Sequence, residues 1–478
     1  MRRVCLTLPT NRPSAATIRA VAEEAAHGAR GSDTEVHLLV LDSSDPATLA
    51  AHREVVAALS PAPGVVVHHY DEDRQRTFLR KVIERSGAAS PGRLLDLVLP
   101  SGTSYGACTD RAFLLAEALG CSSVHRRDSD SRYQYLDGEP VFPFPLELAT
   151  LGPPASEVSG RVTRSRLDPA FADRPVSLVG GSFVGEMSVD LDEIRRLDPA
   201  VYEEVVGLSV PEGMPELWRR NLIAESFRGA GNTAFTRDLT TLTRVSPTRV
   251  DMCNIALDRE VYSRVPLPPA LDTIGSDYFL IHLVHDAGLP GVLHNRHIVN
   301  YHTPERRSGA GFLAYHLRYA KFLLSGPLFE AVYDTLRQAG DALLDGDGRI
   351  RPEAVAPALR AGAAVDRTRG AERLAALTGA YRRLGGRYAE AAHRLTGHAE
   401  ELLDEVHRDL ADFALLADAW PALTLAARTL GGPGPANGAV RGSRAQDLAH
   451  GSADGAAHTP MSGTTGDRTD RRTAGSPA

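Results

Sequence analysis

The first part of the chain alternates between short apolar runs and longer runs in which apolar residues recur at helical spacing. The apolar runs cover residues 3–8, 35–41 and 64–69, and the helical ones cover 14–27, 47–59 and 74–85. The former have the length of strands, and the latter place their apolar residues on one face of a helix. Strands that are apolar on both faces and alternate with helices form parallel sheets covered on both sides. The pattern predicts a doubly wound α/β fold.

The pattern changes in the middle of the chain. Residues 105–120 predict a loop followed by a helix, and a short β-compatible run follows from Cys121. The pair Asp137-Gly138 is the sequence signal of a tight hairpin. Residues 143–168 are rich in proline, glycine and serine and predict a long loop, and a further helix is expected from about residue 276 to Asp286.

After residue 310 the pattern is helical. Amphipathic spacing predicts helices at 312–324 and 329–344, and an amphipathic hairpin or long helical seam at 371–430. The seam is expected to pack against the preceding part of the chain, and a homodimer through the same helices is the alternative. Residues 431–478 carry few large apolar side chains and much glycine, serine and threonine, which predicts a disordered tail.

Composition narrows the classes of function. Of 478 residues, 43% are hydrophobic and 24% are charged, and the formal net charge is -7. These values favour a globular protein and argue against a broad surface for nucleic acid or anionic membranes. The 4 cysteines lack metal-ligand spacing, so buried thiols in a reducing cytosol are expected. Because no run approaches the roughly 20 apolar residues that span a bilayer, we expect a cytoplasmic protein without a membrane span.

The most informative chemistry is the tripeptide Asp128-Ser-Asp130, which follows the β-compatible run. Two carboxylates at i and i+2 lie on the same side of an extended backbone and can both face one hard divalent cation. The same tripeptide is also typical of an Asx-turn. Arg126 and Arg127 precede it directly, and they either bind phosphate or pair with the two aspartates.

Further polar residues follow other predicted strands. Asn11 and Arg12 come after the first strand, Asp42 and Asp45 come after the second, and the predicted helix at 105–120 carries Asp110 and Arg111. In doubly wound sheets the ligand binds outside the carboxyl ends of the strands. We therefore expect these side chains to converge with Asp128 and Asp130 on one ligand, with Arg111 directed toward a nucleotide.

The order of these motifs resembles the nucleotide-sugar-binding half of GT-A glycosyltransferases and is most similar to uncharacterised actinobacterial members. The resemblance is carried by Pro9-Thr-Asn-Arg12, Leu41-Asp-Ser-Ser-Asp45, the helix at 106–120 and Asp128-Ser-Asp130. It implies a GT-A-like doubly wound mixed sheet over residues 1–305, a C-terminal helical region at 306–430 and the tail at 431–478. It also implies that Thr10 and Arg12 contact the nucleoside, that Asp42 holds the base or ribose, and that Asp128 and Asp130 hold the ribose and the cation.

The same resemblance points to residues later in the chain. In that family an acidic residue like Asp277 heads a helix that faces the acceptor, and in inverting members it accepts the proton of the attacking hydroxyl; a helix cap is the alternative. Asp251 and Asn254 fall on the acceptor-side strand and loop, or they form a cap and a turn. His302 follows the last core strand, where a histidine completes the cation site, and imidazole favours manganese over magnesium. Arg306 and Arg307 are placed to reach the diphosphate.

Together these features predict a metal-dependent glycosyltransferase that moves a sugar from a nucleotide-sugar donor to a small-molecule acceptor, by analogy in secondary metabolism. A divalent cation, Mn2+ or Mg2+, would be held by Asp128, Asp130 and His302. The alternatives are a nucleotidyltransferase and a non-catalytic nucleotide or sugar binder. A nucleotidyltransferase would need a glycine-rich phosphate loop after the first strand, where residues 9–13 contain no glycine.

Overall fold

The computed structural model describes residues 1–30, 32–211, 213–302 and 304–433. From residue 434 on, the predicted disordered tail lies outside the described residues. The main sheet is built from strands that are far apart in the sequence. They are β1 (Arg2–Thr10), β2 (Thr34–Asp42), β3 (Val65–Asp71), β4 (Ser123–Arg127), β8 (Arg164–Ser165), β9 (Leu178–Gly180), β11 (Thr240–Thr243), β12 (Asn254–Asp258) and β13 (Gly291–His294).

The sheet has 9 strands in the order β3-β2-β1-β4-β12-β9-β13-β11-β8. The first four strands in this order are parallel, and β12 runs antiparallel to both β4 and β9. The prediction of a doubly wound mixed sheet is confirmed. Thr10 pairs with Asp42, and Asp42 pairs with Asp71, so the carboxyl ends of β1, β2 and β3 lie at one edge.

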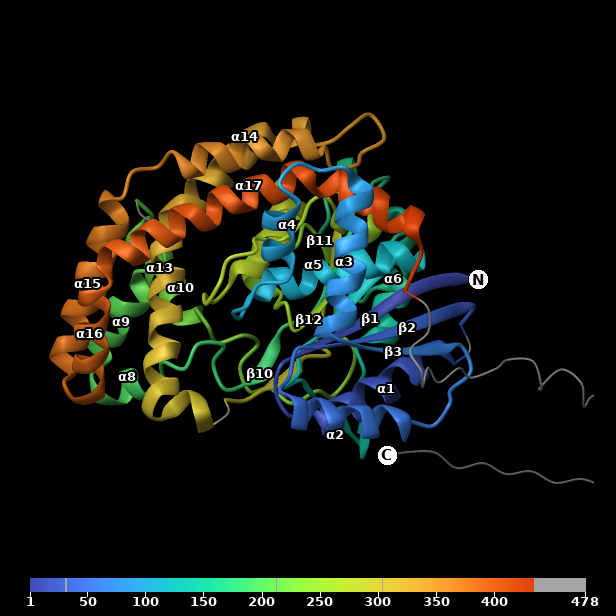
Figure 1. Cartoon of the computed structure of the whole chain (residues 1–478), viewed down its shortest axis with the longest axis horizontal. Helices are drawn as coiled ribbons and strands as arrows, with labels where there is room; N and C mark the ends of the chain where they lie inside the picture. The colour runs from blue at the N-terminus through green and yellow to red at the C-terminus, as the bar shows by residue number, and fades with distance from the viewer. Residues whose placement is uncertain (31, 212, 303, 434–478) are drawn as a thin grey trace, which may run out of the picture. The chain divides into compact units, whose positions relative to one another are not determined.

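Helices cover both faces of the parallel strands (Figure 1). The helices α1 (Ala15–Ala29) and α2 (Pro46–Ala57) pack on one face, where Leu6 and Val40 are buried. On the other face lie α3 (Glu72–Ser86), α4 (Pro91–Val98) and α5 (Tyr105–Leu119), against Cys5 and Leu41. Successive strand residues point to opposite faces, so a strand buried on both sides must be apolar throughout. This explains the continuous apolar runs of the sequence.

The prediction of a long loop at 143–168 is wrong. This segment contains α6 (Phe144–Thr150), α7 (Ala155–Val158), the 3-10 turn η1 (Ser159–Arg161) and strand β8, and η2 (Pro169–Phe171) follows it. Its prolines precede or begin these helices, where a missing N–H costs nothing. Phe144 and Val158 are fully buried. Proline interrupts helices in their interior but is compatible with their first turn, so its abundance does not by itself indicate a loop.

The hairpin at Asp137-Gly138 is confirmed. It joins β6 (Tyr135–Leu136) to β7 (Glu139–Pro140), and both turn residues have positive φ, 52° at Asp137 and 86° at Gly138. Beside it, β5 (Arg132–Tyr133), β14 (Ile298–Asn300) and β10 (Phe183–Gly185) form a small sheet in the order β10-β14-β5. This sheet ties the segment after Asp130 to the segment before His302.

Shorter helices connect the later strands. They are α8 (Asp192–Leu197), α9 (Pro199–Gly207), α10 (Glu216–Glu225), η3 (Pro247–Arg249), α11 (Arg259–Tyr262), η4 (Ser276–Tyr278), α12 (Phe279–Asp286) and η5 (Pro304–Arg307). The C-terminal region contains α13 (Gly309–Ala339), η6 (Gly340–Leu343), α14 (Pro352–Ala363), α15 (Thr368–Leu384), α16 (Gly386–Gly397) and α17 (Ala399–Leu430). Where two helices were predicted at 312–324 and 329–344, α13 continues through Pro327, which is buried between neighbouring helices.

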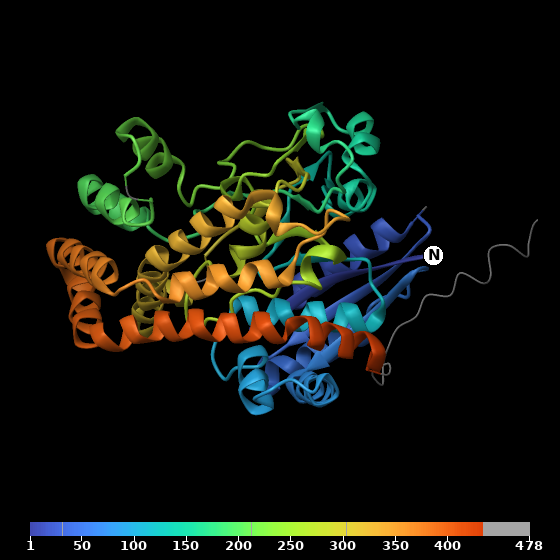
Figure 2. The same cartoon turned by 90° about the horizontal axis from the view of Figure 1, so that it is seen from above.

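The C-terminal helices share a core with the sheet region. Trp420 of α17 is fully buried, and its indole Nε1 donates to the carbonyl of Tyr262 at 2.9 Å. The helix runs beside α5 and α3 (Figure 2). The predicted packing of this region against the preceding part of the chain is confirmed. By length and composition α17 could also cross a membrane, although half of its most apolar window is buried in the structure, as expected for a core helix.

The burial of Asp258 at the start of α11 can be tested by the pH dependence of stability. The Asp258 carboxylate caps α11 by accepting from the Glu260 N–H at 2.8 Å, and burial raises the pKa of Asp258 to about 6. Between pH 4 and 6 the folded chain therefore keeps a proton that the unfolded chain releases, so stability falls as pH rises. We expect the free energy of unfolding of wild type minus that of Asp258→Asn to fall by about 2 kcal/mol across this range. Urea titrations at pH 4 and pH 6 measure this difference; a constant difference would contradict the burial argument.

Candidate functional site

Polar residues gather where β1 and β4 end. The strand order runs β3-β2-β1 and then continues to β4 on the other side of β1, so the order reverses at this point. In doubly wound sheets the crevice at such a reversal is where ligands bind. The loop after β1 carries Arg12, the loop after β4 carries Asp128 and Asp130, and η4 and η5 add Asp277 and Arg306.

Arg12 joins the two strand ends. Its Nη2 donates to Asp130 Oδ2 at 2.8 Å, and its Nε donates to Ser129 Oγ at 3.0 Å. Arg306 Nη2 lies 4.0 Å from the same Asp130 oxygen and its guanidinium carbon lies 5.8 Å from the Tyr315 ring centroid. Asp130 therefore has two guanidinium groups beside it, one from the loop after β1 and one from η5.

Arg126 holds a second pair of carboxylates. Its Nη2 lies 2.9 Å from Asp128 Oδ1, and its Nη1 donates to Asp277 Oδ2 at 2.5 Å. Burial by itself lowers the pKa of Arg126, but Asp128 and Asp277 outweigh it and raise that pKa well above its usual value. Burial also raises the pKa of Asp277, against the opposing charge of Arg126. Of the two roles open to Arg126, the structure has it pairing with an aspartate of the motif.

Arg127 points to the opposite face of β4. It is fully buried, its Nε and Nη2 donate to Glu24 at 3.0 and 2.9 Å, and its Nη2 also donates to Glu147 at 3.0 Å. Neighbouring residues on a strand face opposite sides, which separates Arg127 from Asp128 and Asp277, the partners of Arg126. The structure therefore places Arg127 in a buried ion-pair cluster, apart from the site.

Asp42 pairs with Thr10 at the end of β1, where the loop that carries Arg12 begins. Its Oδ2 accepts from His52 Nδ1 at 2.8 Å and from His69 Nε2 at 2.9 Å, and the Ser44 N–H donates to its Oδ1 at 3.0 Å. Burial raises the pKa of Asp42, but these hydrogen bonds outweigh burial and lower it. The Ser14 N–H donates to His52 Nε2, so neutral His52 carries its proton on Nδ1.

The same network continues into the loop after β1. Ser14 Oγ lies 3.0 Å from Thr10 Oγ1, which donates to the carbonyl of Arg12 at 2.9 Å. The Arg12 backbone is held in this way by Thr10 and, through His52, by Asp42. Asn11 is exposed at the tip of the loop.

Two other predicted residues lie on a helix that borders the site. Arg111 in α5 is buried and donates to the carbonyl of Val98 at 3.0 Å, and burial lowers the pKa of Arg111. Asp110 accepts from the Leu267 N–H at 2.8 Å. Both side chains join α5 to neighbouring segments, and the structure does not bring Arg111 to the strand ends.

The turn before β12 adds Asp251 to the group. Its Oδ2 accepts from the Tyr278 hydroxyl at 2.5 Å, and its Oδ1 accepts from the Cys253 N–H at 3.0 Å. Tyr278 follows Asp277 in η4, so this bond fixes the turn that carries Asp277. Asn254 is buried, and its Nδ2 donates to the carbonyls of Ser182 and Arg296.

His302 lies beside Arg306. Its backbone N–H donates to the Glu186 carboxylate, and its ring Nδ1 lies 3.4 Å from Arg306 Nη1. Its buried ring Nε2 has no hydrogen-bond partner among the described residues. Burial lowers the pKa of His302, which favours the neutral imidazole. Within the described part of the chain, no three His, Cys, Asp or Glu side chains come together as a metal site. Asp128, Asp130 and His302 do not form such a group here, and their role as ligands stays a prediction.

A family model described as a family of unknown function, DUF6271, matches residues 2–434. The chain belongs to this family. No curated protein matches the sequence.

Solved structures resemble the DUF6271 chain at low scores. Glucosyl-3-phosphoglycerate synthase from Mycobacterium tuberculosis, in complex with phosphoglyceric acid, is 17% identical over 68% of this chain and 80% of its own, with a TM-score of 0.34. A mannosyltransferase from Pyrobaculum calidifontis, in complex with GDP-Man and Mn2+, is 16% identical over 87% of both chains, again with a TM-score of 0.34.

Sequence reasoning missed three residues of the DUF6271 site. Tyr278 holds Asp251, and His52 and His69 hold Asp42. The position of Tyr278 directly after Asp277 is the one sequence signal that could indicate a role for its hydroxyl. His52 lies on the buried side of α2, and its position offers no sequence signal that separates it from a core histidine.

Proposed function

We propose that this protein is a glycosyltransferase that moves a sugar from a nucleotide-sugar donor to a hydroxyl or amine of a small-molecule acceptor. The observation that carries the proposal is the hydrogen-bonded ion pair of Arg12 with Asp130, at 2.8 Å, where β1 and β4 end and the strand order reverses. Carboxylates and guanidinium groups at these strand ends supply the two kinds of contact that a diphosphate and its cation need.

The charges of the site support a divalent cation. Asp128, Asp130, Asp251 and Asp277 are four carboxylates, and Arg12, Arg126 and Arg306 are three cations, which leaves a formal charge of -1 when all are ionised. A nucleoside diphosphate adds further negative charge, so it needs additional positive charge to bind here. The donor oxygens of Asp128 and Asp130 suit Mg2+ or Mn2+, and the imidazole of His302 favours Mn2+.

In this proposal Asp128 and Asp130 hold the cation, with His302 as the third ligand, and a bound cation would neutralise charge on the leaving diphosphate. Arg12 and Arg306, which face Asp130 from two sides, would then be available to bind phosphate oxygens. Thr10, Asn11 and Asp42 border the nucleoside, and Asp42 acts by holding the loop that carries Arg12.

Asp277 is proposed to meet the acceptor and take its proton, as a general base. A base works best when its pKa lies closer to the operating pH, and burial moves the pKa of Asp277 in that direction. Asp251 and Tyr278 position the turn that carries Asp277. Substitution of Tyr278 should therefore act through Asp277.

Titration calorimetry with UDP-glucose, GDP-mannose, UDP and GDP, each with and without Mn2+, tests the proposal. We expect at least one diphosphate to bind, with affinity raised at least ten-fold by Mn2+, and slow release of free sugar from the matching donor. Binding without any release of sugar would favour a non-catalytic binder. If none of the four nucleotides binds under either condition, the glycosyltransferase proposal is wrong.

A further inference from the structure

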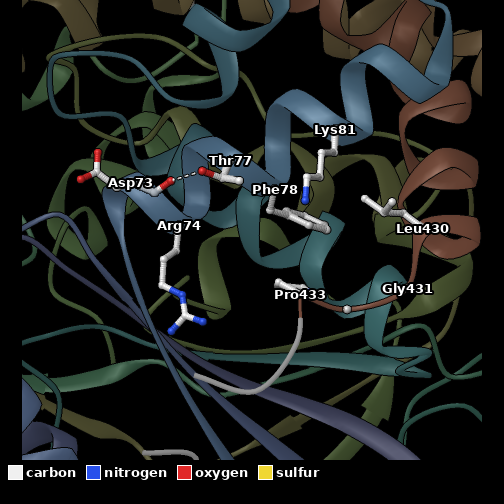
Figure 3. A pocket seen from close by; sticks show the side chains of 9 residues that line it. Asp73, Arg74, Thr77, Phe78, Lys81, Leu430, Gly431 and Pro433 are labelled. Carbon is white, nitrogen blue, oxygen red and sulfur yellow. Dashed lines mark hydrogen bonds between the residues drawn. The ribbon is translucent and has the colours of Figure 1, made fainter. Parts of the chain in front are cut away.

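A cavity of about 440 Å3 lies between α3 and the C-terminal end of α17 (Figure 3). Its walls are formed by Asp73, Arg74, Thr77, Phe78, Lys81, Leu430 and residues 431–433. None of the residues at the ends of β1 and β4 lines it. The cavity is therefore separate from the proposed transfer site.

One face of α3 forms the longer wall. Arg74, Thr77, Phe78 and Lys81 follow one another at intervals of three, one and three residues, so they lie on the same side of the helix. Phe78 is 3% exposed and supplies an apolar floor, with Leu430 across from it. Two cationic side chains, half-buried Arg74 and exposed Lys81, stand at either end of this floor.

The cavity carries more positive than negative charge. On the same helix Arg76 pairs with Glu72, whereas neither Arg74 nor Lys81 forms an ion pair with any residue in the described part of the chain. Asp73 contributes one negative charge, so the cavity keeps a net charge of +1. An apolar floor between two cations suits an organic anion that carries a ring. The ring of the ligand is desolvated on the floor, while its anionic group keeps a charged partner.

Both walls are fixed by polar contacts outside the cavity. Arg85 Nε donates to Thr429 Oγ1 at 2.9 Å, Arg428 Nη2 donates to the buried Glu117 at 2.7 Å, and the Tyr70 hydroxyl donates to the Pro433 carbonyl at 3.5 Å. These contacts join the end of α17 to α3, α5 and β3. A ligand would therefore enter a cavity that already exists, without the cost of ordering its walls.

We propose that this cavity binds a small organic anion of the aromatic phosphate, sulfonate or carboxylate class. Its anionic group contacts Arg74 at one end of the floor, its ring lies against Phe78 and Leu430, and its other end lies beside Lys81. The proposal does not depend on glycosyl transfer at the other site.

The sequence offers an unusually selective probe of Lys81. The chain has lysine only at positions 81 and 321, and Lys321 is 4% exposed and lies 2.8 Å from Asp409 and 3.1 Å from Glu405. Pyridoxal 5′-phosphate is an aromatic phosphate whose aldehyde condenses with a free amine, with loss of water, to an imine that borohydride reduces to a stable amine. Mass spectrometry of the peptides from the treated chain measures the label at Lys81, with the buried Lys321 as an internal reference.

We expect pyridoxal 5′-phosphate to label Lys81 with saturation and at least ten-fold faster than pyridoxal, which lacks the phosphate, at equal low concentration. Arg74→Gln should remove this advantage, and Arg80→Gln, an exposed arginine on the same helix outside the cavity, should leave it unchanged. Equal labelling by the two aldehydes, or a rate that rises without saturation, would mean adventitious reaction and overturn the proposal. An equal loss in Arg80→Gln would overturn it too, because general surface charge would then explain the advantage.

Discussion

Asp130→Asn is expected to lower kcat/KM for the nucleotide-sugar donor by about 100-fold or more, while the protein stays folded. The substitution keeps the shape of the side chain and removes the charge that Arg12 and Arg306 face. Loss of one charged group that stabilises a transition state typically costs about 10²–10³ in rate. The cost in stability should stay within about 1 kcal/mol, because the Arg12–Asp130 pair is partly exposed and Arg12 keeps its bond to Ser129.

Asp137→Asn is the matched control for this prediction. Asp137 is an exposed aspartate of the nearby hairpin turn with a positive φ, a conformation that asparagine tolerates well. It should leave both kcat/KM and the urea midpoint unchanged. If Asp130→Asn retains wild-type kcat/KM with its best donor, Asp130 has no role in transfer and the proposed site is wrong.

Arg127→Met is expected to lower the free energy of unfolding by about 3–5 kcal/mol. The change leaves Glu24 and Glu147, both fully buried, without the guanidinium that bridges them, and an uncompensated buried charge has a cost of this order. Burial raises the pKa of Glu147, but Arg127 and His125 outweigh burial and lower it in the native protein. Since that depressed pKa stabilises the fold at neutral pH and the benefit disappears as pH falls through the range of the carboxylate, the wild-type advantage over Arg127→Met should shrink in acid.

Urea unfolding at pH 7 measures this loss, and two further variants serve as controls for it. Arg76→Met removes the partner of Glu72 in an exposed i,i+4 pair and should cost less than about 1 kcal/mol. Adding Glu24→Gln to Arg127→Met should restore part of the loss, because it removes one of the two unpaired charges. If Arg127→Met loses as little stability as Arg76→Met, Arg127 does not have this structural role. If Arg127→Met stays folded but binds nucleotide more weakly, Arg127 belongs to the binding site.

Some parts of the site could be predicted from the sequence. Strand ends are marked by polar residues after continuous apolar runs, so Arg12, Asp42 and the Asp128-Ser-Asp130 motif could be assigned to one edge of a sheet. The partners of those residues could not be assigned. Asp42 is covered by His52 from α2 and His69 from β3, and nothing in the local pattern around either histidine marks the approach of a buried carboxylate.

Arg126 and Arg127 show the limit most clearly. They are identical in type and adjacent in sequence, yet Arg126 pairs with Asp128 and Asp277, and Arg127 bridges Glu24 and Glu147 on the opposite face of β4. Alternation along a strand predicts that they point apart, but three of the four acids that pair with them, Asp277, Glu24 and Glu147, lie 20 to 151 positions away in the sequence. Which arginine belongs to the site depends on contacts between distant segments.

The sequence by itself determined the doubly wound order of strands and helices, since apolar periodicity is a local property of the chain. It also determined that carboxylates and arginines follow the ends of β1, β2 and β4. Only the tertiary structure decided that Asp130 meets Arg12, that Asp42 supports a loop, and that 143–168 folds into helices and a strand. The reason is physical: the partner of a buried charge is selected by proximity in space, because desolvation forces each such group to find one.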